Sequence, residues 1–461
     1  MRGKTMFEIS DTVAAISTPR GKGGIAVIRI SGEETAAVLR RVFRASVDPA
    51  SAPRKAVFGK IVDAEGEVID EGLAVFFAGP HSFTGEDVAE ISCHGGVLVT
   101  ECVLSAVLAA GARPAAAGEF TRRALLNGKM TLSSAEALGA LLEAQTTGQM
   151  TLAGSGMAGR LSAAVETHFS RLSALLADAY AKIDFPDEDL NTMSHEELTE
   201  AFAAVEGELR RLLDTYRTGH AVAEGISTVI CGPVNAGKST LYNALVGREA
   251  AIVTDVAGTT RDILCETVAL GAVTLRLFDT AGLRETADTV EGIGIDRARR
   301  AMEEAELILA VFDAGAPLGE GEQALLQQLR EMSATVVIVL NKCDNGMRFS
   351  ADVLQNFEHV VQISAKGGDV HALRELVERL YLADGISLRE DAVVANARQY
   401  AALKRGADAL SVAVDSLRVG VPLDAACIDA ELAMAALGEV DGRAVDEAII
   451  SDIFSHFCVG K

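Results

Sequence analysis

The sequence of 461 residues is poor in several residue types that mark special classes of protein. It has no tryptophan, nine prolines and an aromatic content of 5%. Because hydrophobic residues make up 49% of the chain, this composition is typical of a well-folded protein rather than a disordered one. A chain of this length is too long for one hydrophobic core, so we expect two to four domains.

Other absences argue against a membrane protein, a secreted protein and a zinc site. No apolar run reaches the roughly 18 residues that a membrane-spanning helix needs. The first residues carry early positive charges but no following apolar stretch, so we expect no secretory signal and a cytoplasmic protein. The cysteines are scattered and form no Cys-X-X-Cys pair, which favours reduced thiols over disulfides or a zinc site.

Positive charge is also scarce, since the formal net charge is −23. A protein that grips nucleic acid over its whole surface is basic, because its affinity comes from neutralising phosphates. Any contact with nucleic acid must therefore use a local basic patch or a partner protein. The alternative interpretation is that the acidity simply aids solubility.

The most informative stretch is the glycine-rich sequence GPVNAGKS at residues 232–239. It follows an apolar run at 227–231 that predicts a buried parallel strand, and it precedes a predicted helix start at 240–246. This order of strand, loop and helix is that of a phosphate-binding P-loop. Backbone N–H groups would surround the phosphates, Lys238 would reach the β- and γ-phosphates, and Ser239 would hold Mg²⁺.

A further motif and a threonine-containing stretch follow the P-loop in the sequence. The motif DTAG at 279–282 follows a predicted strand at 273–278, so that Asp279 can hold Mg²⁺ through water. Either Thr259 or Thr260 could close over Mg²⁺ when the third phosphate is present.

The base is selected by the motif NKCD at 341–344, which ends a predicted strand at 335–340, and the motif SAK at 364–366 completes the pocket. The Asp344 carboxylate can accept hydrogen bonds from N1–H and the 2-amino group of guanine, and adenine lacks this pair of donors. The sequence therefore predicts GTP and GDP as ligands. The predicted nucleotide-binding residues are Asn235, Ala236, Gly237, Lys238, Ser239, Thr240, Thr254, Asp255, Val256, Ala257, Gly258, Thr259, Thr260, Asp279, Thr280, Ala281, Gly282, Asn341, Lys342, Asp344, Ser364, Ala365 and Lys366, with Ser239 and Thr260 at Mg²⁺.

The group that would orient the attacking water is less evident. Leu283 follows Gly282 at the position where Ras-like enzymes place a glutamine. Arg261 and Arg284 are candidates for an arginine finger without a clear placement. Glu291 is the candidate acid, although the residues alone favour the simpler role of a glutamate that stabilises a helix start.

Before the P-loop, residues 7–128 alternate strand-like and helical runs, and their glycine-rich clusters predict loops, as in 118–129. His94 is predicted to be a loop histidine with a partner of its own. From about residue 130 to the P-loop the apolar residues have helical spacing. The same spacing returns after the nucleotide-binding motifs, at 396–453. The simplest interpretation is one helical domain interrupted by an inserted nucleotide-binding domain.

Two local signals refine the helical part. Ser194 and Glu197 predict a capping box at a helix start, and Gly219 predicts the end of that helix. The acidic stretch at 184–189 predicts a solvated turn rather than a metal site.

Several longer stretches, taken with the nucleotide-binding motifs, share the pattern of one known family. They are GGIAVIRISG at 23–32, SFTGEDVAEISCHGG at 82–96, GEFTRRALLNGK at 118–129, DFPDED at 184–189, REAAIVTDVAGTTRD at 248–262 and FCVGK at 457–461. In these stretches the chain resembles the MnmE (TrmE) family of tRNA-modification GTPases over nearly its whole length. Val459 stands where the family usually has isoleucine.

The resemblance implies a multidomain fold of α/β and α domains. Residues 1–128 would form an N-terminal α+β domain for folate binding and dimerisation, and 223–382 an inserted doubly wound P-loop GTPase domain. Residues 129–222 and 383–461 would form the two parts of a helical domain, the second carrying the C-terminal tail.

The resemblance also implies a second chemistry. Arg29, Glu90 and Lys129, with the terminal Lys461, would bind 5-formyl- or 5,10-methylene-tetrahydrofolate, and the charges of these side chains suit that ligand. The family acts as a homodimer, in a hetero-oligomer with an FAD-dependent partner of the MnmG (GidA) type. Together they add a (carboxymethyl)aminomethyl group to C5 of the wobble uridine of tRNA. Cys458 would either take part in this chemistry or merely pack in the site.

Potassium-stimulated hydrolysis is a further property that the resemblance implies. The Asn235 side chain would bind K⁺ together with the carbonyl groups of Thr254, Val256 and Thr259. This cation would do the work of an arginine finger when GTPase domains pair. Glu291 matches the family's water-positioning acid.

Two other interpretations lie outside this family. A ribosome-assembly GTPase of the Era type would act as a switch without a second chemistry. Such a protein would need a basic RNA-binding segment, and the net charge of −23 speaks against one. A scaffold protein whose nucleotide site only gates dimerisation would not need the complete set of motifs.

Overall fold

The computed structural model describes residues 11–185, 192–249, 265–278, 300–348, 351–383, 385–443, 445, 447–457 and 459–460. The chain forms two compact units, which we call the first unit (1–136 with 441–461) and the second unit (137–440). The helix α4 (Leu132–Glu143) passes from one to the other in sequence. Among the described residues, no helix is both long enough and apolar enough to span a membrane.

The first unit is built on a seven-stranded sheet with the order β3-β4-β5-β6-β2-β1-β7. All neighbouring strands are antiparallel except β1 and β7, which are parallel. Its elements are β1 (Val13–Ile16), β2 (Ile25–Ser31), α1 (Thr35–Val42), β3 (Phe43–Arg44), β4 (Val57–Val62), β5 (Val68–Phe77), β6 (Val88–His94), α2 (Val97–Ala109), β7 (Arg113–Pro114), α3 (Glu119–Leu126) and α16 (Glu447–Ser455), with a short 3-10 turn at Pro49–Ser51.

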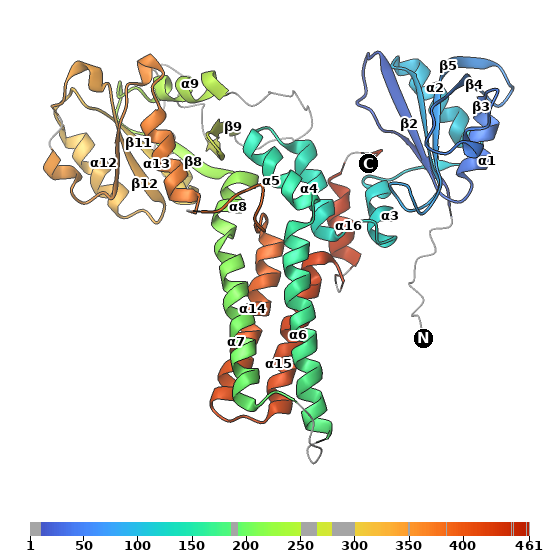
Figure 1. Ribbon diagram of the computed structural model, residues 1–461. Coiled ribbons are helices and arrows are strands. Elements are labelled where there is room, and N and C mark those ends of the chain that lie inside the picture. The colour runs from blue at the N-terminus through green and yellow to red at the C-terminus, as the bar shows by residue number, and fades with distance from the viewer. Residues whose placement is uncertain are drawn as a thin grey trace. The chain divides into compact units, whose positions relative to one another are not determined.

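Alternation along β2 sends its side chains to opposite faces of this sheet. Ala26, Ile28 and Ile30 lie in a core that α1 and α2 cover (Figure 1). The residues between them point to the other face, where Val13 and Ala15 of β1 pack against the buried Phe120 of α3. The first unit therefore has a face covered by α1 and α2 and a face approached by α3.

Part of the glycine-rich cluster at 118–129 is helical, so the prediction of a loop was wrong over α3. Gly118, with φ 61°, turns the chain into the helix, and Phe120 and Ala124 are buried one turn apart. Arg123 is also fully buried, because it forms ion pairs with acidic residues. Because the charged Arg123 lies on the buried side of α3, the apolar spacing typical of a helix is not visible in the sequence of this stretch.

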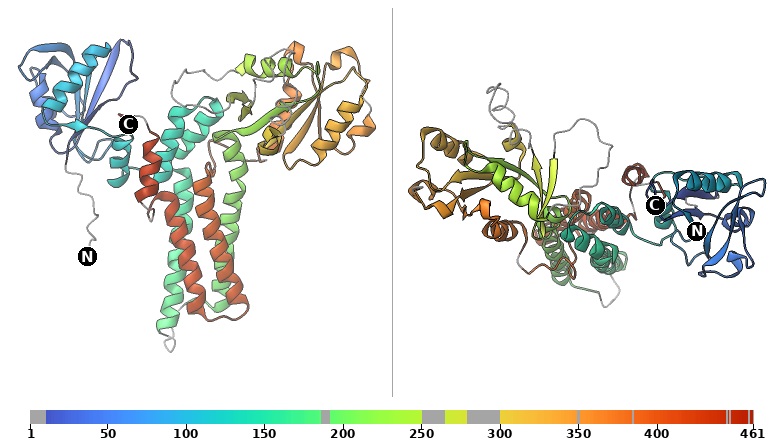
Figure 2. Two further views of the ribbon diagram at one scale, coloured as in Figure 1. Left: turned by 180° about the vertical axis from the view of Figure 1, so that it is seen from behind. Right: turned by 90° about the horizontal axis from the view of Figure 1, so that it is seen from above.

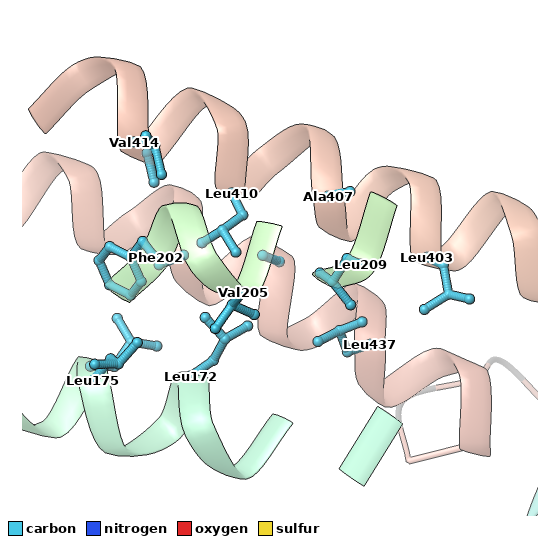
Figure 3. Close-up of a cluster of buried hydrophobic side chains, with 14 of the residues drawn as sticks. Leu172, Leu175, Phe202, Val205, Leu209, Leu403, Ala407, Leu410, Val414 and Leu437 are labelled. Atoms are coloured by element: carbon cyan, nitrogen blue, oxygen red, sulfur yellow. The ribbon is translucent and has the colours of Figure 1, made fainter. Parts of the chain in front are cut away.

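In the second unit, helices from before and after the nucleotide-binding motifs form one bundle. These helices are α6 (Arg160–Asp184), α7 (His195–Asp214), α14 (Ala397–Arg418) and α15 (Leu423–Asp441). Figure 3 shows their apolar side chains converging, with Phe202 between Leu175 and Val414. The predicted apolar faces of α6 and α7 and the capping box of Ser194 and Glu197 are confirmed.

Gly219 does not end α7, so this prediction was wrong. The helix ends at Asp214, and Gly219 lies inside the next helix, α8 (Tyr216–Ala223). The glycine is needed there because a Cβ atom at this position would lie 2.0 Å from the carbonyl oxygen of Val394.

The nucleotide-binding motifs lie on a six-stranded sheet with the order β13-β12-β11-β8-β10-β9, parallel except for β9. Figures 1 and 2 show helices on both sides of this sheet. Its elements are β8 (Ile226–Cys231), α9 (Lys238–Glu249), β9 (Cys265–Leu270), β10 (Val273–Phe278), β11 (Leu307–Asp313), α12 (Glu320–Arg330), β12 (Thr335–Asn341), β13 (His359–Gln362) and α13 (His371–Tyr381), with 3-10 turns at Cys343–Asn345, Ala351–Leu354 and Ala365–Gly367; α5 (Thr147–Met157) packs beside α8.

Candidate functional site

Two glycines of the P-loop are held at positions where a side chain cannot fit. At Gly232, with φ 138°, a Cβ atom would lie 2.1 Å from the carbonyl oxygen of Val311. At Gly237, with φ 98°, it would lie 2.2 Å from the Asn341 amide nitrogen. The loop thus needs glycine both for its backbone angles and for close packing on β11 and β12.

Lys238 stands at the mouth of this loop. Its ammonium group donates hydrogen bonds to the carbonyl oxygens of Gly232 (2.9 Å) and Pro233 (2.8 Å). Partial burial lowers the pKa of Lys238, because desolvation disfavours the charged form. A phosphate bound in the loop would stabilise the charged form of the Lys238 ammonium group and so offset the cost of its burial. Ser239 and Thr240 lie in the first turn of α9 and are exposed.

The guanine motif and the P-loop are joined through Lys342. Its ammonium group donates to the backbone carbonyl of Asn235 at 2.6 Å and to the Asp313 carboxylate at 2.7 Å. Lys342 in turn holds the pKa of Asp313 below its usual value. Asn235 has φ 64°, a left-handed conformation that asparagine tolerates better than most residues. Asp313 was not singled out from the sequence; its place at the end of β11 was the available signal.

The predicted base-recognition residues come together at the ends of β12 and β13. Asn341 donates from its amide to the Ala236 carbonyl at 3.1 Å and accepts from the Ala365 N–H at 3.0 Å. Asp344 accepts a hydrogen bond from the Ser364 hydroxyl at 2.8 Å. Lys366 lies in the adjoining 3-10 turn. A carboxylate fixed in this way is arranged to receive the two N–H donors of guanine.

Other predicted residues lie outside the described part of the chain. They are Thr254, Asp255, Val256, Ala257, Gly258, Thr259, Thr260, Asp279, Thr280, Ala281, Gly282, Glu291, Cys458 and Lys461, together with Arg261, Leu283 and Arg284. Their roles stay predictions.

In the first unit, Arg29 and Glu90 occupy directly opposed positions on β2 and β6. The Arg29 guanidinium donates from two nitrogens to one oxygen of Glu90, at 2.8 and 3.0 Å. It also lies over the rings of Phe83 and Phe120, 5.3 and 5.7 Å from their centres, at distances typical of cation–π contacts. Because Glu90 keeps an oxygen without a contact to Arg29, the pair offers both a cation and an acceptor to a ligand.

Lys129 and the C-terminal tail lie near other parts of the same unit. The Lys129 ammonium group donates to the Pro80 carbonyl at 2.8 Å, and a Cβ atom added to Gly85, in the loop that carries Phe83, would lie 3.3 Å from the Lys129 side chain. The Ser17 hydroxyl donates to the Gly460 carbonyl at 2.9 Å. This bond fixes the chain immediately before Lys461.

A buried charge cluster supports this loop. Arg123 is fully buried and contacts Glu86, which also accepts from the Ser31 hydroxyl at 2.7 Å. Burial raises the pKa of Glu119, but hydrogen bonds from Arg113, the Ala116 N–H and Arg123 outweigh it and lower that pKa. The sequence predicted a loop for the stretch GEFTRR and gave no local signal that Arg123 is buried.

His94 does have a partner, as predicted, although it is the last residue of β6 rather than part of a loop. Its Nδ1 lies 2.8 Å from an oxygen of Asp70, whose other oxygen accepts from the His94 N–H. Among the described residues, no cluster of histidine, cysteine and acidic side chains could hold a metal ion.

The fold and the site define a guanine-nucleotide-binding P-loop protein with a separate folded unit that carries an arginine–carboxylate pair. Family models for the GTP-binding protein TrmE N-terminus and for the MnmE helical domain match residues 12–129 and 132–458. The chain therefore belongs to the MnmE family and is a tRNA modification GTPase. The multidomain fold predicted from the sequence is confirmed, as is GTP or GDP as the ligand class.

Curated relatives match over nearly the whole chain. The tRNA modification GTPase MnmE of Symbiobacterium thermophilum is 42% identical over 98% of this chain and 99% of its own. The protein of that name in Bacillus subtilis is 39% identical over 98% of this chain and 100% of its own. Among solved structures, the G domain of the T. maritima FeoB iron transporter is 26% identical, with a TM-score of 0.24 over 33% of this chain and 93% of that chain.

Proposed function

We propose that this GTPase works with an FAD-dependent partner protein to add a (carboxymethyl)aminomethyl group to C5 of the wobble uridine of tRNA. The carbon unit would come from 5-formyl- or 5,10-methylene-tetrahydrofolate held in the first unit. The observation that carries this proposal is the pair of Arg29 and Glu90, fixed opposite each other in the sheet beside an exposed Phe83.

These residues fit a folate chemically. Folate combines a flat pterin ring with hydrogen-bond donors and a tail that ends in carboxylates. Glu90 would accept from the pterin, Arg29 and Lys129 would attract the carboxylates, and the exposed ring of Phe83 beside Arg29 provides an apolar contact. Lys461 follows the anchored Gly460 and would add a further positive charge. When bound, the folate would supply the one-carbon unit.

In the nucleotide site, Ser239 and Thr260 would hold Mg²⁺, and Asn235 would bind K⁺ with the carbonyl groups of Thr254, Val256 and Thr259. The left-handed Asn235 supports this role, since Lys342 holds its backbone while its side chain is exposed. A cation at this point would offset the negative charge of the phosphates during hydrolysis. Glu291 would orient the attacking water.

A homodimer through the first unit is part of this proposal. Phe58 of β4 and Leu73 of β5 are directly opposed and 64% and 43% exposed. These two neighbouring apolar side chains would lose contact with water if another chain covered this face of the sheet. A second copy of this chain is the occupant that the family suggests.

Mass spectrometry of wobble uridines in cells that lack this gene tests the proposal. We expect the aminomethyl-type groups at C5 to disappear and to return with the wild-type gene but not with the Arg29→Ala variant. An unchanged set of wobble nucleosides in the cells without the gene would contradict the modifying role.

A further inference from the structure

The first unit contains a concave site at the glycine-rich loop 20–24 (Arg-Gly-Lys-Gly-Gly) that joins β1 to β2. The cavity has a volume of about 300 Å³. Its lining consists of Ile16, Thr18, Pro19, Arg20, Gly21, Lys22, Gly23, Ile25, Ala26, Gly95, Val97, Thr100 and Glu101. The loop is fixed at its end by a hydrogen bond of 2.9 Å from the Gly23 N–H to the Gly95 carbonyl.

This cavity is distinct from the arginine–carboxylate site. Ile16 and Ala26, which line it, belong to the sheet face covered by α1 and α2. Arg29 lies against Phe120, which packs on the opposite face of the same sheet. Two different ligands, or two parts of the reaction, can therefore be served by one unit.

The two cations of the cavity are available to a ligand. Arg20 and Lys22 are exposed, and neither has an ion-pair or hydrogen-bond partner among the described residues. At Gly21 and Gly24 a Cβ atom would meet nothing within 4 Å, so the loop backbone is open to close approach. Positive side chains beside accessible backbone suit an anion.

The surrounding charge makes this spot unusual for the chain. Acidic and basic residues nearly balance within the first unit, so most of the net charge of −23 belongs to the second unit. A polyanion is therefore repelled less by the first unit than by the second unit. On the first unit, the exposed side chains of Arg20 and Lys22 can bind it.

The lining also indicates which part of a nucleic acid fits. It holds no aromatic side chain, whereas sites that grip unpaired bases use aromatic rings for stacking. Its volume is at the lower end of that of small-molecule sites, which suits one phosphodiester group with its sugar rather than a base-paired element.

We propose that Arg20 and Lys22 bind a phosphodiester group of the tRNA substrate in this cavity, so that loop 20–24 positions the RNA on the first unit. This inference rests on the proposed function, because it takes tRNA as the substrate. It identifies the local basic patch that an otherwise acidic protein needs for contact with RNA.

Binding of a fluorescein-labelled tRNA transcript with an unmodified wobble uridine, followed by anisotropy over a series of KCl concentrations, tests this proposal. The double variant Arg20→Glu and Lys22→Glu of the full chain should bind on the order of ten-fold more weakly at low salt. The slope of log affinity against log salt should fall by about one to two, because two phosphate contacts are lost.

Two control variants separate the cavity from general charge, and Lys55→Glu is to be compared with Lys22→Glu alone, which changes the charge by the same amount. Lys55→Glu changes an exposed lysine that has no side-chain partner among the described residues, elsewhere in the first unit, and it should weaken binding much less. Glu101→Gln removes the acidic group of the lining and should tighten binding. GTP turnover and the unfolding temperature should be unchanged in all of these variants.

Equal binding by the double variant and Lys55→Glu, or no binding of the transcript by the wild-type chain, would overturn the inference. If the wild-type gene still restores the wobble modification in cells, the proposed function stands despite that result. If it does not, the proposed function fails as well.

Discussion

Gly219 and Val394 are packed so closely that a Cβ atom on Gly219 would lie 2.0 Å from the Val394 carbonyl oxygen. Gly219 lies on the chain that enters the nucleotide-binding sheet, and Val394 on the chain that leaves it. The neighbouring Thr215 hydroxyl accepts from the Val394 N–H at 3.0 Å, and the Thr218 hydroxyl accepts from the Ala383 N–H at 2.9 Å. The two connections to the helical bundle are thus fastened to each other.

Gly219→Ala should destabilise the second unit by about 3 kcal/mol, because the added methyl group must displace backbone atoms rather than a flexible side chain. Urea unfolding of the full chain measures this. Gly207→Ala is the matched control: a Cβ atom added to Gly207, inside α7, would meet nothing within 4 Å, so alanine should stabilise by about 0.5–1 kcal/mol. Equal stability of the two variants would show that the connections are not tightly packed.

GTP turnover should rise many-fold when K⁺ replaces Na⁺, because a fitted cation takes the place of an arginine finger. Asn235→Gly should abolish this response and keep GTP binding, since glycine accepts the left-handed backbone of φ 64° but has no side-chain oxygen. Steady-state phosphate release in the two salts measures it. Equal rates in K⁺ and Na⁺ for the wild-type chain would remove the potassium assignment.

Glu291→Ala should bind GTP normally and hydrolyse it at least about a hundred-fold more slowly, because a positioned carboxylate speeds water attack by this order. Nucleotide affinity and single-turnover hydrolysis are measured on the same preparation. Full turnover would return Glu291 to the role of a glutamate at a helix start.

Arg29→Ala should lose folate binding in calorimetry with GTP affinity intact, since the two sites lie in different units. Arg29→Lys should recover only part of the affinity, because lysine keeps the charge but cannot make the contact through two guanidinium nitrogens. Unchanged folate affinity in Arg29→Ala would leave the arginine–carboxylate pair with a purely structural role.

His220 should make stability depend on pH. Its pairing with Glu224, and then with Glu306, raises the pKa of His220. A raised folded-state pKa stabilises the fold fully below the unfolded pKa of about 6.5, and this contribution is lost as the pH rises through the folded pKa. His220→Gln should therefore lower the unfolding temperature at pH 6 more than at pH 8.5. The exposed His371, changed to Gln, is the control; an equal effect of His220→Gln at both pH values would contradict the linkage.

Local patterns predicted the strands and helices well where the apolar period was regular. The strand at 273–278 and the apolar faces of α6 and α7 are examples. The predictions from local patterns were wrong where a tertiary contact determines the role of a residue. Gly219 carried the signal of a helix end but allows a close approach to a distant backbone. Arg123 lies in a stretch that was predicted to be a loop, but it is in a helix and is buried among carboxylates.

The sequence by itself determined the nucleotide-binding motifs and their order, because a P-loop or a guanine-binding motif is a contiguous stretch whose chemistry depends on local spacing. It also determined the two amphipathic helical regions. Only the tertiary structure decided that these regions share one core and that Arg29 lies opposite Glu90 on the adjacent strand. The same holds for the hydrogen bonds of Lys342 to both Asn235 and Asp313. Such contacts join residues far apart in the chain, and their geometry is set by sheet register and packing rather than by any local pattern.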